Sequence, residues 1–307
     1  MFLALLDLCI LSFVSALILL SLLSLCFIFH LRLKSKSLLH LQDFNSLWTV
    51  RFLLVLFIFF WALSQLLLPL RLFSFLSPIP LPRQAELCRL HIVLSLGFFQ
   101  PAFLVTLLFL LNASIRKKTP NDSWAISFVL LTCLPISLVH LLFILLRPYE
   151  LRLPLSFHQT SVVRTIDDSG IETVLCAYPL LNSIVFAAFG VSYGLWFLCS
   201  TWKVLSLVIN KGLRIRIYGL AFAVLGSLTV QIVFLGVMAL WNPDEDLYSV
   251  ATLVVFLSAL CSATAGEGIL VIKPISDALD AGGKCCQIPS EGGQSRRSTA
   301  GVGSTSV

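Results

Sequence analysis

Long apolar runs separated by short polar connections dominate the chain. Seven of these runs reach the roughly 20 residues that an α-helix needs to cross the hydrocarbon core of a bilayer. They cover approximately 8–31, 48–70, 91–111, 124–146, 174–200, 218–241 and 248–272. The pattern predicts an all-α polytopic membrane protein, with a bundle of seven transmembrane helices over 1–273. Four prolines fall inside spans, namely Pro69, Pro101, Pro135 and Pro179. We expect kinks there, with the freed carbonyls satisfied by neighbouring helices.

Composition supports a lipid environment. The chain is 58% hydrophobic and only 12% charged, with a mean hydropathy of +0.97. Soluble domains carry about 25% charged residues. A lipid bilayer is therefore the expected partner. We interpret the net charge of +6 as a signal of orientation and not of nucleic-acid binding.

Basic residues are distributed unequally between the two sides of the predicted bundle. The odd-numbered connections and the tail hold 15 of the 21 lysines and arginines, and the other side holds 6. The positive-inside bias therefore predicts an N-terminus outside the cytosol and a cytosolic C-terminus. The two glycosylation sequons, at Asn112 and Asn121, lie in a connection assigned to the cytosol and argue mildly for the opposite orientation.

The C-terminal tail, 274–307, is polar and rich in Gly, Ser and Thr towards its end. We expect it to be cytosolic and largely disordered, because it cannot bury a core. Cys285 and Cys286 follow the last span closely, an arrangement that suits palmitoylation. Ser298 follows two arginines and is a weak candidate for phosphorylation.

Two cysteines lie on the predicted outer side. Cys88 precedes span three, and Cys176 ends the longest outer connection, which we expect to form a small structured lid. They either form a disulfide bond that ties this connection over the helix ends or remain two unpaired thiols.

Glu267 is the one acidic residue deep inside a predicted span. A carboxylate there should face the bundle interior, and we expect contact with Gln231 or Asn182. It is interpreted as a proton or cation site, a polar switch or a structural hydrogen-bond partner. Other polar residues within spans are Gln100, His140 and Tyr178, which either line a ligand cavity in the outer half or form interhelical hydrogen bonds.

Catalytic motifs are absent from the sequence. It contains no GxSxG, HExxH or P-loop pattern, so we expect no enzyme activity, no cofactor and no metal. A metal hydrolase with His91, His140 and His158 as ligands is a less favoured alternative, because no HxxxH pair supports it.

The seven spans, the cysteines at spans three and five and the cysteine pair after span seven resemble the plan of G-protein-coupled receptors. The DRY, CWxP and NPxxY motifs of rhodopsin-like receptors are missing. The segments 146–150 (LRPYE), 176–181 (CAYPLL) and 189–193 (FGVSY) are similar to an uncharacterised family of plant seven-span proteins, candidate G-protein-coupled receptors. That resemblance implies a plasma-membrane or endomembrane location and no defined ligand.

Two functions follow as hypotheses. The first is a receptor-like protein that signals binding of an unknown ligand to a heterotrimeric G protein or another cytosolic signalling protein. The alternative is a small-solute or proton-coupled transporter that uses Glu267, although the internal repeat of such carriers is missing. Small residues at four-residue spacing in spans five and seven indicate close helix packing within the bundle, with a homo-oligomer as the weaker alternative.

Overall fold

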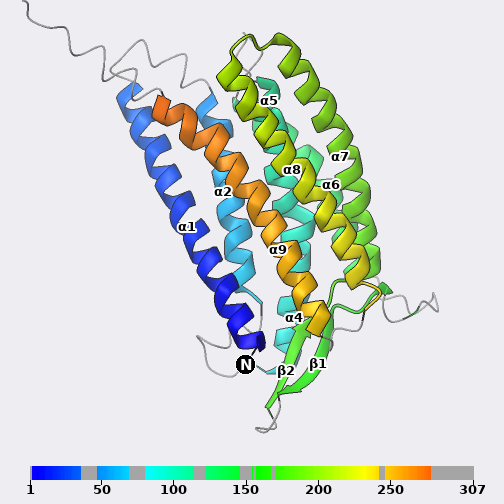
Figure 1. Ribbon diagram of the computed structural model, residues 1–307. Coiled ribbons are helices and arrows are strands. Elements are labelled where there is room, and N and C mark those ends of the chain that lie inside the picture. Colours follow the sequence, from blue (N-terminus) through cyan, green and yellow to red (C-terminus); the bar gives the residue numbers. More distant parts are fainter. Residues whose placement is uncertain are drawn as a thin grey trace, which may run out of the picture.

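A computed structural model of the chain shows a long helical bundle closed at one end by a β-hairpin (Figure 1). The structure describes residues 2–35, 47–68, 80–113, 122–145, 154, 157–166, 171–241 and 246–277. Within them, seven helices are long and apolar enough to cross a membrane. Residues 274–277 of the predicted tail continue the last helix, and the rest of the tail, including Cys285, Cys286 and Ser298, lies outside the described residues.

The seven rods run alternately up and down the bundle. Their elements are α1 Phe2–Ser35, α2 Trp48–Leu66, α4 Leu81–Ile92, the π-helix η3 Val93–Phe99, α5 Gln100–Ala113, α6 Asp122–Leu145, α7 Leu180–Leu207, α8 Lys211–Met238, α9 Asp246–Glu267 and the π-helix η5 Gly268–Ile272. The elements α4, η3 and α5 form one continuous rod, and α9 and η5 belong to another that ends at Asp277.

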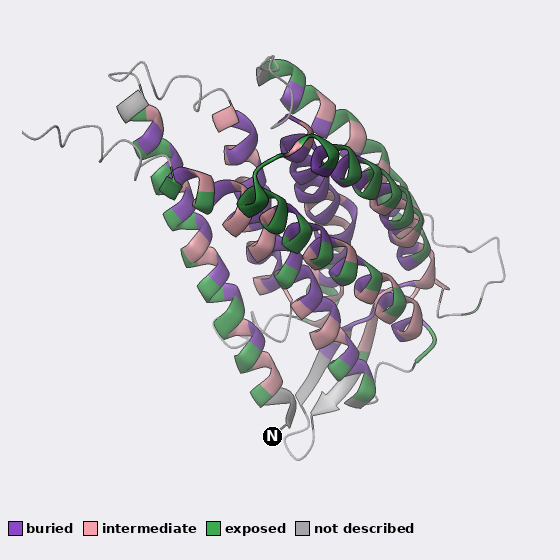
Figure 2. Ribbon diagram, turned by 45° about the horizontal axis from the view of Figure 1, so that its top comes forward, coloured by how far each residue is buried: buried purple, intermediate pink, exposed green. Residues whose placement is uncertain are grey.

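The rod of α4, η3 and α5 occupies the centre of the bundle. Every residue of α5 except Asn112 is buried, and Figure 2 shows this core surrounded by helices with exposed outer faces. A helix that is apolar on all sides is either covered by protein or in contact with lipid, and α5 is covered by protein. By contrast, α1 lies at the edge of the bundle beside α2 and α9, and it exposes large apolar side chains such as Leu19 and Leu23. Such exposed apolar faces suit contact with lipid tails.

Several helices differ from the predicted spans in their bounds. The third rod begins at Leu81, ten residues before the predicted start, because the polar turn of α4 continues the same helix. The fifth span was predicted from residue 174, which is wrong, because residues 174–176 belong to a strand and the helix begins at Leu180.

Within the described residues, the structure is nearly all helical, as predicted, and a single β-hairpin is added to the bundle. β1 Ser161–Ile166 pairs antiparallel with β2 Ile171–Cys176, with Ser161 opposite Cys176. It lies at the same end of the bundle as the start of α1 (Figure 1). We call this end of the bundle the hairpin end. The opposite end, where α1 ends and α8 begins, is called the basic end. Both strands of the hairpin are rich in β-branched residues, which favour strand structure.

Small residues let neighbouring helices approach closely inside the bundle. A Cβ atom at Gly190 of α7 would lie 2.9 Å from Ile232 Cδ1 of α8, and one at Gly266 would lie 2.7 Å from Leu107 Cδ1 of α5. The predicted small-residue faces therefore pack within the chain.

Candidate functional site

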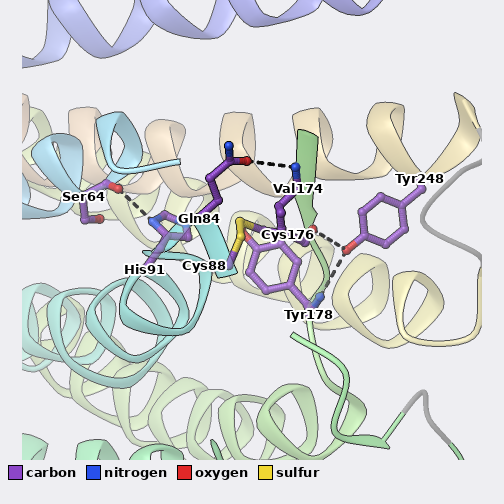
Figure 3. The surroundings of a disulfide bond; sticks show 8 residues. All are labelled: Ser64, Gln84, Cys88, His91, Val174, Cys176, Tyr178 and Tyr248. Atoms are coloured by element: carbon purple, nitrogen blue, oxygen red, sulfur yellow. Dashed lines mark hydrogen bonds between the residues drawn. A yellow bond between two sulfur atoms is a disulfide. The ribbon is translucent and has the colours of Figure 1, made fainter. Parts of the chain in front are cut away.

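Two contacts attach the hairpin to α4. The structure joins Cys88 of α4 to Cys176 of β2 by a disulfide bond, with 5.3 Å between the Cα atoms, which is the bonded alternative that the sequence left open. One helical turn earlier, the side-chain oxygen of Gln84 accepts a hydrogen bond from the backbone N–H of Val174 at 3.0 Å (Figure 3). The base of β2 is thus fixed to the central rod.

A third contact attaches the hairpin to α9. The hydroxyl of Tyr248, on the first turn of α9, accepts a hydrogen bond from the backbone N–H of Tyr178 at 3.1 Å (Figure 3). It also donates to the carbonyl oxygen of Cys176 at 3.4 Å. Because this ring is almost fully buried, the phenol is held at the point where β2 leads into α7.

A small cavity lies within the half of the bundle nearest the hairpin. It is lined by parts of α2, of the central rod and of α9, and by Tyr178: Trp61, Gln65, Leu68, Ser95, Leu96, Gln100, Tyr178, Thr252, Val255, Phe256 and Ala259. Its volume of about 20 Å³ is enough for a single ordered water molecule. No lining residue carries a charge.

Ser95 connects two walls of this cavity. Its hydroxyl oxygen accepts hydrogen bonds from Trp61 Nε1 at 3.1 Å and from Gln65 Nε2 at 3.3 Å, both on α2. One turn away, His91 Nδ1 donates to the carbonyl oxygen of Ser64 at 2.8 Å, since a carbonyl can only accept. The Trp61 ring also stacks on Phe256 of α9, with centroids 5.9 Å apart. These contacts hold α2 against both the central rod and α9.

Gln100, which lines the cavity, carries an unsatisfied polar atom. Its Nε2 donates to Gln231 Oε1 of α8 at 3.2 Å. Its own Oε1 is buried and has no hydrogen-bond partner. An amide oxygen in this state favours a bound hydrogen-bond donor, because a buried acceptor without a partner costs roughly 1–3 kcal/mol.

His140 and Asn182 form a separate pair between α6 and α7. The Asn182 amide donates to His140 Nδ1 at 3.0 Å, which leaves the proton of a neutral ring on Nε2. A Cβ atom at Gly97 of η3 would lie only 3.1 Å from the His140 Cβ. The His140 side chain therefore fits against η3 because position 97 is a glycine. The pair does not line the cavity.

Glu267 lies away from all of these groups. Its fully buried carboxylate accepts a hydrogen bond from the Ser21 hydroxyl of α1 at 3.2 Å. The expected contact with Gln231 or Asn182 is wrong, because Gln231 pairs with Gln100 and Asn182 with His140. The reason is that α1 packs against α9, an arrangement that spacing along the chain does not reveal.

The three-histidine metal site is not formed. Among the described residues, which include His91, His140 and His158, no group of three or more His, Cys, Asp or Glu side chains could hold a metal ion. His91 and His140 are instead bonded to Ser64 and Asn182.

Four residues of this arrangement were missed by the sequence analysis, namely Ser21, Trp61, Ser95 and Tyr248. Ser21 and Ser95 look like ordinary small residues in apolar runs. Tyr248 marks the start of a span, where aromatic residues are common, so its position carried no signal for a hydrogen bond to the hairpin.

Comparison with known proteins places this architecture in a family. A family model described as "Uncharacterised conserved protein UCP031277" matches residues 2–285, which include all seven helices and the hairpin. The chain belongs to this family. No curated protein matches the chain. The family description assigns no ligand or activity, so a functional proposal depends on the geometry above.

Proposed function

We propose that the chain is a receptor-like membrane protein that binds a small neutral polar ligand in the cavity around Ser95. The observation that carries this proposal is the uncharged polar cavity between α2, the central rod and α9, at the end of the bundle held by the disulfide-anchored hairpin. Receptor ligands bind in sites where a few polar groups converge within apolar walls, as they do here.

The chemistry of the cavity limits its ligand. A charged ligand would enter without a counter-charge, which is strongly unfavourable in a buried site. The free Gln100 Oε1 calls for a hydrogen-bond donor, and the Trp61 and Phe256 rings offer apolar faces. A neutral molecule with hydroxyl or primary amide groups fits both requirements.

The small size of the cavity provides a mechanism for signalling. Since the cavity holds about one water molecule, a larger ligand requires the Trp61–Phe256 stack to open and α9 to move. A ligand that binds the open arrangement better than the closed one shifts the balance between them. The rod of α9 extends from Tyr248 at the hairpin to Asp277 at the basic end, where Asp277 pairs with Arg216 of α8 at 2.7 Å.

The proposal includes the orientation and partner expected from the sequence. The hairpin end faces outside, which agrees with the charge distribution and with an oxidising environment for Cys88 and Cys176. The basic end faces the cytosol in the plasma membrane or an endomembrane. There Lys211, Arg214 and Arg216 would contact a heterotrimeric G protein or another signalling protein.

Ligand binding is testable in lipid nanodiscs. We would measure the thermal stability of the full chain against a panel of monosaccharides, polyols and primary amides, because a ligand at 100 times its Kd stabilises by about 2.7 kcal/mol. Thr252→Val removes a hydroxyl from the cavity wall. The control is Thr229→Val, an exposed threonine of α8 with the same bond to the carbonyl four residues earlier. Stabilisation that is weaker in Thr252→Val and unchanged in Thr229→Val is expected. Equal effects in both variants would contradict binding in this cavity.

Signalling and transport are separated by a second pair of measurements. Capture of a Gα subunit that is lost when Lys211, Arg214 and Arg216 are replaced by alanine supports a receptor. Flux of the same solutes into proteoliposomes that disappears in Glu267→Gln supports the transporter and argues against the receptor. The cavity favours the receptor, because Glu267 is not among its lining residues.

A further inference from the structure

Glu267 occupies a second polar site, between α1 and the far part of the α9 rod. It lies eight residues beyond Ala259, the last cavity residue of α9, which is roughly 12 Å by helix rise. One carboxyl oxygen, Oε2, accepts the hydrogen bond from Ser21, whereas Oε1 is buried without a hydrogen-bond partner. A further hydroxyl or a proton is therefore needed to complete the hydrogen bonding of this carboxyl group.

Ser24 can complete this hydrogen bonding, either as a donor to an ionised carboxylate or as an acceptor from a neutral acid. It lies one helical turn after Ser21 on α1, it is buried beside the same carboxyl group, and its hydroxyl has no partner within hydrogen-bond geometry. A carboxylic acid with its proton on Oε1 has a donor to offer, and Ser24 Oγ has free lone pairs to accept it. Either arrangement pairs both atoms, but only the neutral acid avoids a buried negative charge.

Charged groups on the neighbouring elements do not replace that proton. Lys273, on the same rod, places its Nζ 3.8 Å from Asp277 Oδ1, and Arg216 of α8 also forms an ion pair with Asp277. Both cations are thus paired with Asp277. Arg51 of α2 is buried, and it is not among the groups that act on the Glu267 carboxyl. From α5, the apolar Leu107 packs against Gly266, the residue before Glu267. Within the described residues, only the two serine hydroxyls act on the carboxyl group.

The backbone changes its geometry directly after this residue. Glu267 ends α9, and the π-helix η5 Gly268–Ile272 follows, in which Lys273 N–H donates to the carbonyl of Gly268, five residues earlier. Single π turns within α-helices are frequent at functional positions, because they rotate the side chains that follow. Here the π turn lies between Glu267 and the ion pair at the basic end.

We propose that Glu267, Ser21 and Ser24 form a proton-binding site that controls the docking of α1 on α9. In the docked state Glu267 is a neutral acid that donates from Oε1 to Ser24 and accepts at Oε2 from Ser21. Loss of the proton to water breaks the O–H bond and leaves a buried negative charge, beside which the described part of the chain places no cation. Such a charge is expensive in an apolar interface, so α1 separates from α9 until water reaches the carboxylate.

Infrared difference spectroscopy of the full chain in nanodiscs tests the protonation. At neutral pH we expect the carbonyl stretch of a protonated carboxylic acid, which disappears as the pH is raised. It should be absent in Glu267→Gln and retained in Asp277→Asn, a matched control that removes an exposed carboxyl group from the same rod. A spectrum in which Glu267→Gln has no effect on this band overturns the proposal.

Ser24→Ala distinguishes a proton site from a merely structural contact. Removal of the hydroxyl takes away the acceptor of the neutral acid, so the band should be lost at a lower pH than in the wild type. If Ser24 instead donated to an ionised carboxylate, the change would be in the opposite direction, which would overturn the proposal. Ser12→Ala, an exposed serine of the same helix that bonds only its own backbone, should leave the band unchanged.

Docking of α1 is measured separately by thermal unfolding against pH. The wild type should lose stability over the pH range in which the band disappears, and Glu267→Gln, which keeps the shape of the neutral acid, should not. Equal pH profiles for these two proteins would contradict the control of α1 by the proton.

Discussion

The hydroxyl of Ser137 on α6 donates a hydrogen bond to the carbonyl oxygen of Gly97 at 2.8 Å. Gly97 lies four residues before Pro101, which has no N–H group to donate to that carbonyl. A side chain from the neighbouring helix thus supplies the donor that proline lacks, as the sequence analysis expected for prolines within spans.

Ser137→Ala should destabilise the bundle by about 1 kcal/mol, because it leaves the Gly97 carbonyl without this donor. The penalty should shrink when Pro101→Ala is introduced as well, since alanine restores a backbone N–H. Chemical denaturation in mixed micelles measures the stability of the single and double variants. The control is Ser192→Ala, an exposed serine that bonds only a carbonyl of its own helix. Additive effects of Ser137→Ala and Pro101→Ala would contradict this relationship.

Gly97→Ala should destabilise by about 1–3 kcal/mol, because the new methyl group would lie 3.1 Å from the His140 Cβ and force α6 away from η3. Gly226→Ala in α8 is the matched control, since nothing lies within 4 Å of its Cβ position. That change should be neutral or slightly stabilising. Denaturation midpoints of the two variants that do not differ would show that this close approach is unimportant.

Tyr248→Phe should cost about 1–3 kcal/mol and loosen the hairpin, because the N–H of Tyr178 and the carbonyl of Cys176 both lose their partner. Hydrogen exchange at 171–178 reports the loosening. Tyr218→Phe, in which the exposed ring keeps its place near Arg214, should change neither stability nor exchange. Unchanged exchange in Tyr248→Phe would mean that α9 does not hold the hairpin.

Loss of the Cys88–Cys176 bond should lower stability by about 2–5 kcal/mol, since the bond closes a loop over a sequence separation of 88 residues. The double variant Cys88→Ala/Cys176→Ala should unfold at a lower temperature, and a reductant should then have no further effect. Cys199→Ala, which removes an exposed free thiol of α7, is the control. A reductant effect that persists in the double variant would indicate another disulfide.

The site shows where reasoning from the sequence ends. Gln100, Gln231, His140 and Asn182 were identified as polar residues in spans, because such residues are rare there. Their pairing depended on which helix faces which. The same limit explains why Glu267 was assigned the wrong partners: Ser21 is 246 positions away along the chain, and only the docking of α1 beside α9 makes it a neighbour.

The sequence by itself determined that seven helices form and approximately where each one lies, because the apolar length of a span is a local property of the chain. It also marked the cysteines and prolines that need partners. Only the tertiary structure decided that α5 is central and α1 peripheral, that the outer connection folds into a hairpin, and that Ser95 and Gln100 share a cavity. These features depend on the rotation and depth of each helix against its neighbours, which packing between distant segments sets and the hydropathy pattern does not encode.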